Sequence, residues 1–196
     1  MTDIIIRRGE TWSRTLRWES APFIYTPITA ITKAAPMVVT ASGHGLVTGW
    51  RAAILSAGGM RQANAKSSPP RASDFHKVTF VGSTQVNFND IDSSNYTTYT
   101  SGGYLASYTP VSLASFTARM QIRATVDATA TLVSLTDGAG ITLDDVNHTI
   151  TVILSATATA AYSFTEGVYD LELVSAGGVV TRLLEGNVTV LLEVTR

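Results

Sequence analysis

Three glycines and a histidine stand close together in VTASGHGLVTGW, residues 39–50. Glycine-rich loops cradle phosphates when a Lys-Ser or Lys-Thr pair follows and opens a helix, and histidine binds metals or moves protons. Here the chain continues as WRAAIL, a strand-like run that supplies no helix dipole for a phosphate. We therefore interpret the stretch as a β-turn. In it, Gly43, Gly45 and Gly49 take positive φ angles and His44 hydrogen-bonds the turn.

The other residues capable of chemistry form no recognisable constellation. The three histidines lie far apart in the sequence and lack the i, i+4 spacing typical of zinc ligands. The absence of cysteine excludes thiolate nucleophiles, disulfides and zinc–cysteine sites. We predict no catalytic residue, no metal and no cofactor. Two acidic pairs, Asp144-Asp145 and Asp90-x-Asp92, could offer calcium ligands, but they lack an EF-hand pattern and are better interpreted as solvated turn acids, so calcium binding stays open.

Several residues are candidates for contacts with a partner instead. Arg119 and Arg123 share the polar face of a predicted strand, where they could pair with Asp170 and Glu172 across the sheet or form a subunit contact. Trp50 follows the turn and is a candidate exposed interface anchor.

A tyrosine-rich segment and two adjacent leucines are further candidates. Tyr96 and Tyr99 lie in a Thr/Ser/Gly setting and could bind sugars or a partner, or pack around a loop. Leu191 and Leu192 are neighbours in the last predicted strand, so at least one must face away from the core of its own sheet. We expect one of them to be buried by another layer or by a neighbouring subunit.

The composition indicates a globular protein made of strands. Of the 196 residues, 45% are hydrophobic and only 15% are charged. The net charge of -1 gives no reason to expect binding to nucleic acid or to anionic membranes. The apolar runs are too short for a membrane helix or a signal peptide, so we expect synthesis in a cytoplasm and no membrane contact.

Period-two alternation dominates, as in FTARMQIR (116–123), HTITVILS (148–155) and VYDLELVS (168–175), with turn signals between the runs. The alternation predicts an antiparallel β-sandwich or barrel. Only SATATAAYSF (155–164) is Ala-rich enough for a short helix.

The middle of the chain differs from its flanks. Residues 27–109 hold six basic and three acidic residues, whereas the flanks hold eight basic and twelve acidic ones. This shift and the loop AKSSPPRASD predict a module inserted into a host domain formed by residues 1–26 and 110–196.

Three stretches of the flanks carry a resemblance: RRGETWSRTLRWES, PVSLASFTARMQIR (110–123) and GVYDLELVSAGGVVTRLLEGNVTVLLEVTR (167–196). They resemble a β-sandwich module of tail and baseplate proteins of tailed bacteriophages, which implies an immunoglobulin-like host domain. The middle, with ITAITKAAPMVVTASGHGLVTGW (28–50) and VTFVGSTQVNFNDIDSSNYTTYTSGG (78–103), resembles a small β-barrel-like module. That module is named for the first catalytic-cysteine half of ubiquitin-activating enzymes and recurs in phage tail proteins. Without a cysteine, the name implies no ubiquitin chemistry.

These resemblances imply a non-enzymatic virion structural protein of a tail or baseplate, made in the host bacterial cytoplasm. It would act through interfaces with other virion proteins, as a multi-copy homo-oligomer. One alternative is a head–tail connector, collar or capsid decoration protein. Another is a host-glycan-binding module. A polysaccharide depolymerase ranks last, because it needs a carboxylate pair in a groove and this chain is poor in acids.

Overall fold

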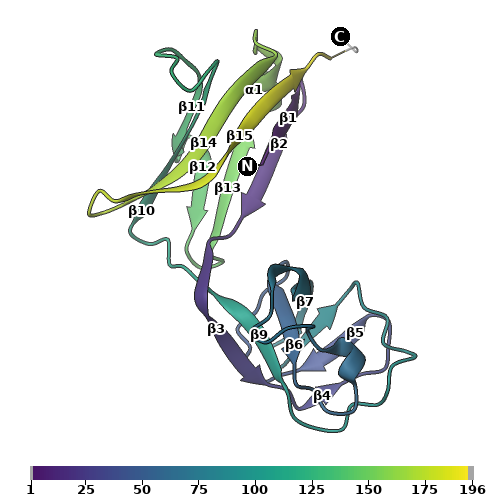
Figure 1. Ribbon diagram of the computed structural model, residues 1–196. Coiled ribbons are helices and arrows are strands. Elements are labelled where there is room, and N and C mark those ends of the chain that lie inside the picture. Colours follow the sequence, from purple (N-terminus) through teal and green to yellow (C-terminus); the bar gives the residue numbers. More distant parts are fainter. Residues whose placement is uncertain (1, 194–196) are drawn as a thin grey trace. The chain divides into compact units, whose positions relative to one another are not determined.

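The computed structural model describes residues 2–193 (Figure 1). Nearly all of its regular elements are strands, which confirms the predicted all-β class. The chain divides into two compact units: unit 1 comprises residues 1–18 and 110–196, and unit 2 comprises residues 19–109. The chain therefore passes from unit 1 to unit 2 after residue 18, earlier than the predicted start of the insert at residue 27. The reason is that β3 (Glu19–Pro27) is hydrogen-bonded to β9 (Tyr104–Pro110), a strand that lies almost wholly within unit 2.

Unit 1 is an eight-stranded sheet with one short helix. The strands follow the order β1-β15-β14-β10-β11-β12-β13-β2. The elements are β1 (Ile4–Arg7), β2 (Trp12–Leu16), β10 (Phe116–Arg123), β11 (Thr131–Asp137), β12 (Gly140–Asp144), β13 (Thr149–Leu154), α1 (Ala156–Ala160), β14 (Glu166–Ser175) and β15 (Val180–Leu191).

This sheet folds over into two layers. Its outermost strands, β1 and β2, are joined by only residues 8–11, which span about 14 Å at most. The two ends of the sheet must therefore lie close together. On the opposite side, β11 pairs with β12 only next to the tight turn that joins them, through Thr136–Gly140 and Asp137–Ile141. One layer is thus β1-β15-β14-β10-β11, and the other is β12-β13-β2.

The core of unit 1 lies between these layers and follows the predicted alternation. Met120, Val152 and Leu171 are buried, as are the residues two positions away from each along the same strands. The predicted helix is present but short. Ser155 caps it by accepting a hydrogen bond from the Ala158 N–H at 3.2 Å.

The prediction of an antiparallel sheet is wrong at two pairings: β11 with β12, which are parallel beside the turn that joins them, and β1 with β15. β1 pairs with β15 in parallel, with Ile4 opposite Val188 and Ile6 opposite Val190. Both isoleucines are buried. The start of the chain therefore completes the core beside the last strand, a pairing between segments that alternation within either strand cannot reveal.

Unit 2 is a nearly closed barrel. Its strands follow the order β3-β9-β6-β7-β8-β5-β4. Besides β3 and β9, these strands are β4 (Ala30–Ile31), β5 (Met37–Thr40), β6 (Arg51–Leu55), β7 (His76–Gly82) and β8 (Gln85–Phe88). The segment after β3 closes the sheet on itself. The Ile28 N–H donates to Gly103 O at 3.0 Å, and the Thr29 N–H donates to Thr40 O at 2.9 Å. Two short 3₁₀ turns, Arg61–Ala63 and Ala72–Asp74, lie in the loop between β6 and β7.

Candidate functional site: a charged groove on the outer face of unit 1

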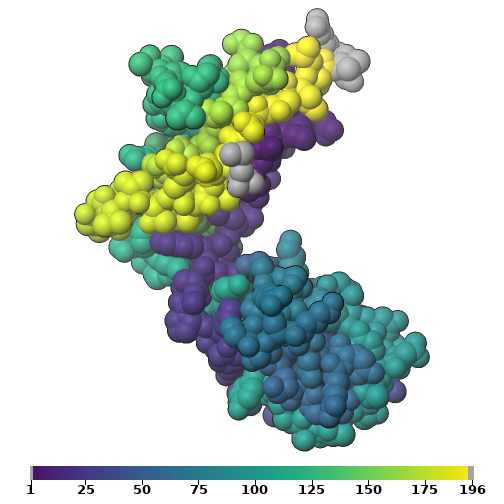
Figure 2. Space-filling view, viewed as in Figure 1, coloured from purple at the N-terminus to yellow at the C-terminus, as the bar shows by residue number. Residues whose placement is uncertain are grey.

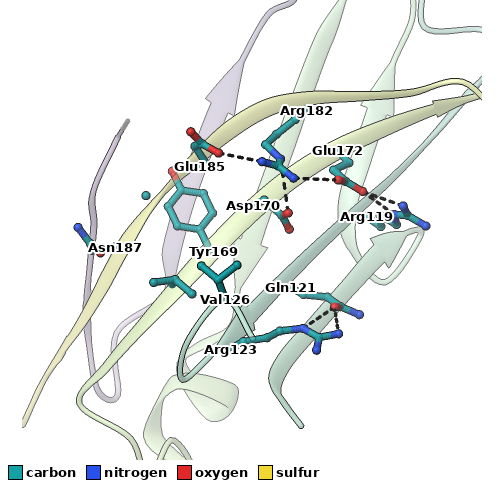
Figure 3. Close-up of a pocket in the computed structure, with 12 residues that line it drawn as sticks. Arg119, Gln121, Arg123, Val126, Tyr169, Asp170, Glu172, Arg182, Glu185 and Asn187 are labelled. Carbon is teal, nitrogen blue, oxygen red and sulfur yellow. Dashed lines mark hydrogen bonds and ion pairs between the residues drawn. The ribbon is translucent and has the colours of Figure 1, made fainter. Parts of the chain in front are cut away.

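Strands β10, β14 and β15 present polar side chains on the face that points away from the core. Strand register aligns these side chains in three rows across the sheet, because directly opposed residues point to the same face. The rows are Arg119–Glu172–Arg182, Gln121–Asp170–Glu185 and Arg123–Val168–Asn187. Their side chains line a groove of about 560 Å³ (Figure 3).

An ion-pair network crosses the first two rows. Arg119 places Nε and Nη2 each 2.8 Å from Glu172 Oε2. Arg182 contacts three carboxylates: Glu185 at 3.0 Å, Asp170 at 3.6 Å and Glu172 at 3.9 Å. The hydrogen bond to Glu185, with support from Asp170, raises the pKa of Arg182. Glu172 is therefore held between two guanidinium groups, while all of these side chains keep some contact with solvent.

Arg123 does not make the cross-strand ion pair that was one of its predicted alternatives. It does not pair with Asp170 or Glu172 but donates to Gln121 Oε1 at 2.8 and 3.1 Å and to the Ala128 carbonyl. These bonds tie the loop after β10 to the rim of the groove, where Val126 from the same loop also lies (Figure 3). Arg119 does pair with Glu172, which is the predicted alternative of an ion pair across the sheet.

Sequence reasoning missed Arg182, which completes the network. A β-bulge lies between Leu171 and Glu172 in the pairing of β14 with β15, so Glu172 faces Arg182 instead of the residue that regular register would give. With Arg119, Arg123 and Arg182 against Asp170, Glu172 and Glu185, the groove has no net charge. It offers many paired donors and acceptors, which suits a polar protein surface better than a strongly charged ligand.

The glycine-rich stretch is a turn of unit 2. Gly43, Gly45 and Gly49 have φ angles of +76°, +62° and +89°, in agreement with the turn interpretation. His44 is only 5% exposed, and both of its ring nitrogens are engaged. Nδ1 accepts from the Leu46 N–H at 2.9 Å, and Nε2 lies 3.0 Å from the Gly82 carbonyl, to which it must donate. The imidazole therefore fastens the turn to the end of β7.

The candidate residues of unit 2 are largely accounted for by packing. Trp50, the candidate exposed interface anchor, is only 8% exposed and belongs to the core of unit 2. Tyr96 and Tyr99 are half-buried against the same core. The Tyr99 hydroxyl lies 3.0 Å from the carbonyls of Ile28 and Gly102, at the point where the barrel closes.

Leu191 and Leu192 are both exposed, at 40% and 65%, whereas Val190 before them is buried. Among residues 2–193, no second layer covers either leucine. Burial of one of them by a neighbouring subunit stays a prediction. The yellow surface of β15 lies open along the visible face of unit 1 (Figure 2).

The two predicted acidic pairs have different partners. Asp90 contacts His76 Nδ1 at 2.7 Å, and Asp92 accepts from the Ser94 N–H at 2.9 Å. Asp145 accepts from the Leu113 and Ala114 N–H groups and from the Ser112 hydroxyl, and these bonds lower its pKa. Asp144 accepts from the backbone and side chain of Asn147, and its pKa is lowered too. Within residues 2–193, no group of three or more His, Cys, Asp or Glu side chains is arranged to hold a metal ion.

Among the described residues, no helix has both the length and the apolar character to span a bilayer. No protein-family model matches the chain, and no curated protein matches it either.

Proposed function

We propose that the chain is a non-enzymatic structural protein of a tailed bacteriophage virion, a tail or baseplate component that acts through protein–protein interfaces. The observation that carries the proposal is the groove of unit 1. Its carboxylates are bound by arginines across three strands, so they are held as fixed recognition elements and not as free acids or bases. The resemblance of the flanking segments to tail and baseplate modules supplies the context.

In this proposal, unit 1 is the immunoglobulin-like host sandwich and unit 2 is a small barrel inserted into it. The geometry of the junction supports an insertion. The Val111 N–H donates to Trp18 O at 3.0 Å, so the chain leaves unit 1 and returns to it at adjacent points. An insertion at such a site disturbs the host sandwich little.

The partners would be other virion proteins and further copies of the chain, assembled after synthesis in the host bacterial cytoplasm. The groove face would be covered in the particle. Neither nucleic acid nor membrane is a partner in this proposal, since the net charge of -1 offers no basic surface in excess.

The test measures how much of the protein is incorporated into virus particles. An affinity-tagged gene is expressed during infection, and particles are purified on a density gradient and analysed by quantitative mass spectrometry and immunogold electron microscopy. We expect multiple copies at the tail. Arg119→Gln should lower incorporation about tenfold or more, because Glu172 would lose a partner inside the contact. Lys33→Glu, on the exposed surface of unit 2, is the matched control. Absence of the wild-type chain from purified particles would refute the proposal.

A second candidate, glycan binding by unit 2, is favoured by one observation. Tyr25 and Tyr104 are about half exposed and meet edge to face, with centroids 6.3 Å apart. Sugars stack on exposed aromatic rings of this kind. A glycan array comparing the wild type with Tyr25→Ala and Tyr104→Ala tests it, and equal signals from all three would remove this candidate.

A further inference from the structure

The first layer of unit 1 has an open edge at β1. The N–H groups of Thr2 and Arg8 donate to Glu185 O and Leu191 O of the β15 segment, at 2.9 and 3.0 Å. Because backbone direction alternates along a strand, the N–H and C=O of Ile5 point the opposite way, out of the sheet. No described strand pairs with this side of β1. Ile5 is also 60% exposed. The β1 edge therefore offers free backbone groups next to an exposed β-branched side chain, with no proline or bulge to block pairing.

The other edge of the same layer is β11, and it is open as well. The N–H and C=O of Thr136 both bond to Ala139 in the turn, so they point away from β10. By the same alternation, the N–H and C=O of Ser134 point away from β10 too. β12 has already diverged there, since its pairing with β11 is confined to Thr136 and Asp137. The upper body in Figure 1 shows β11 on one side and β1 with β2 on the other.

An apolar groove of about 590 Å³ lies beside the β11 edge. Its lining includes the apolar side chains of Leu132, Leu135, Ile153 and Tyr162. Within the described part of the chain, the buried hydroxyl of Tyr162 has no hydrogen-bond partner. That hydroxyl is enclosed by the protein, so what the groove offers a docked strand is room for apolar side chains.

The two sides of unit 1 carry opposite charge. Residues 2–18, which form the β1 and β2 side, contain four arginines and two acids. Residues 124–148, which form the β11 and β12 side, contain four aspartates and no lysine or arginine. Within the second segment, Asp127 and Asp137 are exposed. Two β1 sides would repel each other, and so would two β11 sides, whereas one of each attract.

We propose that copies of this chain dock head to tail, with the β1 edge of one copy adding as a strand to the β11 edge of the next. The occupant of the apolar groove is then the exposed face of a neighbour's β1. Such a contact is heterologous, so it repeats into a ring or a filament instead of closing as a two-fold dimer. The proposal deepens the structural role proposed above by naming a partner, but it rests on the edges of unit 1 and can be tested without particles.

Sedimentation velocity of the full chain, at concentrations up to about 1 mM, provides the test. We expect the wild type to self-associate, and to do so less at high salt. Two variants change the charge of one side each at exposed positions. Arg7→Glu with Ser13→Glu makes the β1 side negative, and Asp127→Lys with Asp137→Lys makes the β11 side neutral. Each variant alone should associate at least about tenfold more weakly, because both sides of the first are negative and the second has lost the charge of one side. An equimolar mixture of the two should recover association, because the unchanged β1 side of the second variant can meet the unchanged β11 side of the first. Lys33→Glu in unit 2 is the control and should behave as the wild type.

Hydrogen exchange gives a second measurement that needs no variant. The amides of Ile5 and Ser134 should be protected at high concentration and exchange freely in dilute protein. The proposal is overturned if the wild type stays monomeric throughout, if either variant alone associates like the wild type, if the mixture fails to recover, or if the two amides show no change with concentration. Association in solution by a chain that is absent from particles would leave this contact standing and remove only the virion role.

Discussion

His44 joins two separate segments of unit 2 through one imidazole ring. Leu46 is 2% exposed, so its N–H cannot turn to solvent if Nδ1 is removed. Thr48 acts beside it, because its hydroxyl accepts from the Phe80 N–H at 3.1 Å. Two side chains, His44 and Thr48, thus bind the turn to β7 beside the backbone bonds of Gly49 and Trp50 to Val78.

A graded set of substitutions tests this role of His44. In His44→Asn the shorter side chain can still accept from Leu46 but cannot reach Gly82, so we expect a loss of about 1 kcal/mol in the free energy of unfolding. His44→Ala leaves the buried Leu46 N–H unpaired and should cost about 1–3 kcal/mol. Gly45→Val forces a β-branched residue to positive φ and should cost about 1–2 kcal/mol. Urea denaturation measures all three. Equal stability of the wild type and His44→Ala would contradict the account.

Asp145 gives unit 1 a dependence on pH. Its carboxylate accepts hydrogen bonds from the Leu113 N–H, the Ser112 hydroxyl and the Ala114 N–H, which hold its pKa below the ordinary value of 3.8. A group with a lowered pKa in the folded state stabilises the fold above its unfolded pKa. That stabilisation is lost as the pH falls through the folded pKa.

Melting temperatures from neutral pH down to about pH 2 test this dependence. Asp145→Asn should be less stable than the wild type at neutral pH and should approach it in acid, because asparagine has no proton to gain. Asp127→Asn, in the exposed loop after β10, is the control and should follow the wild-type curve. Parallel curves for the wild type and Asp145→Asn would rule out this contribution.

At the scale of elements, burial changes sharply at the end of β15, over residues 190–192. Val190 is buried, while Leu191 and Leu192 are exposed. Leu191 lies opposite Arg7 of β1 in the sheet, on the same face as the exposed Ile5. Large apolar side chains placed in this way are typical of a surface that a neighbour covers.

Single charge substitutions distinguish the roles of these three residues. Leu191→Asp and Leu192→Asp should leave the chain folded, with little change in melting temperature, but should lower its incorporation into particles about tenfold or more. Val190→Asp buries a charge and should cost roughly 4 kcal/mol, enough to unfold unit 1. Circular dichroism and quantitative mass spectrometry of particles provide the readouts. Normal copy number for both leucine variants would show that no neighbour covers them.

At the scale of the whole molecule, the two units fold around separate cores. The hydrogen bond from the Val111 N–H to Trp18 O brings the two exits of unit 1 together. In unit 2, the Thr109 hydroxyl donates to Pro22 O at 2.6 Å and joins that unit's ends. In each unit, the two points where the chain crosses to the other unit therefore lie next to each other.

Deletion of residues 19–109 tests this independence. Joining Trp18 to Pro110 through two glycines should leave a cooperatively folding sandwich, because neither the core nor the strand pairing of unit 1 includes the deleted residues. A sharp thermal transition and β-type circular dichroism are the expected readouts. A broad transition, or a spectrum without strand signal, would mean that unit 1 depends on unit 2.

Much of the fold could be predicted from the sequence, because burial within a strand follows a local period of two. Met120, Val152 and Leu171 are core residues for that reason, and Gly43 and Gly45 take turn angles that other residues adopt at a cost. A short helix could be predicted as well, from an Ala-rich run preceded by a capping serine.

The candidate site depended on contacts between segments far apart in the chain. Arg182 belongs to the network because a bulge between β14 and β15 shifts the register and places it opposite Glu172. Arg123 instead donates to the Ala128 carbonyl of the loop that follows its own strand. Trp50 was buried by the path of a turn whose neighbours come from other strands. The parallel pairing of β1, and with it the open edge at Ile5, joins the two ends of the chain. Alternation shows which face of a strand is apolar, but only the assembled sheet decides which strand lies beside it and which edge stays free.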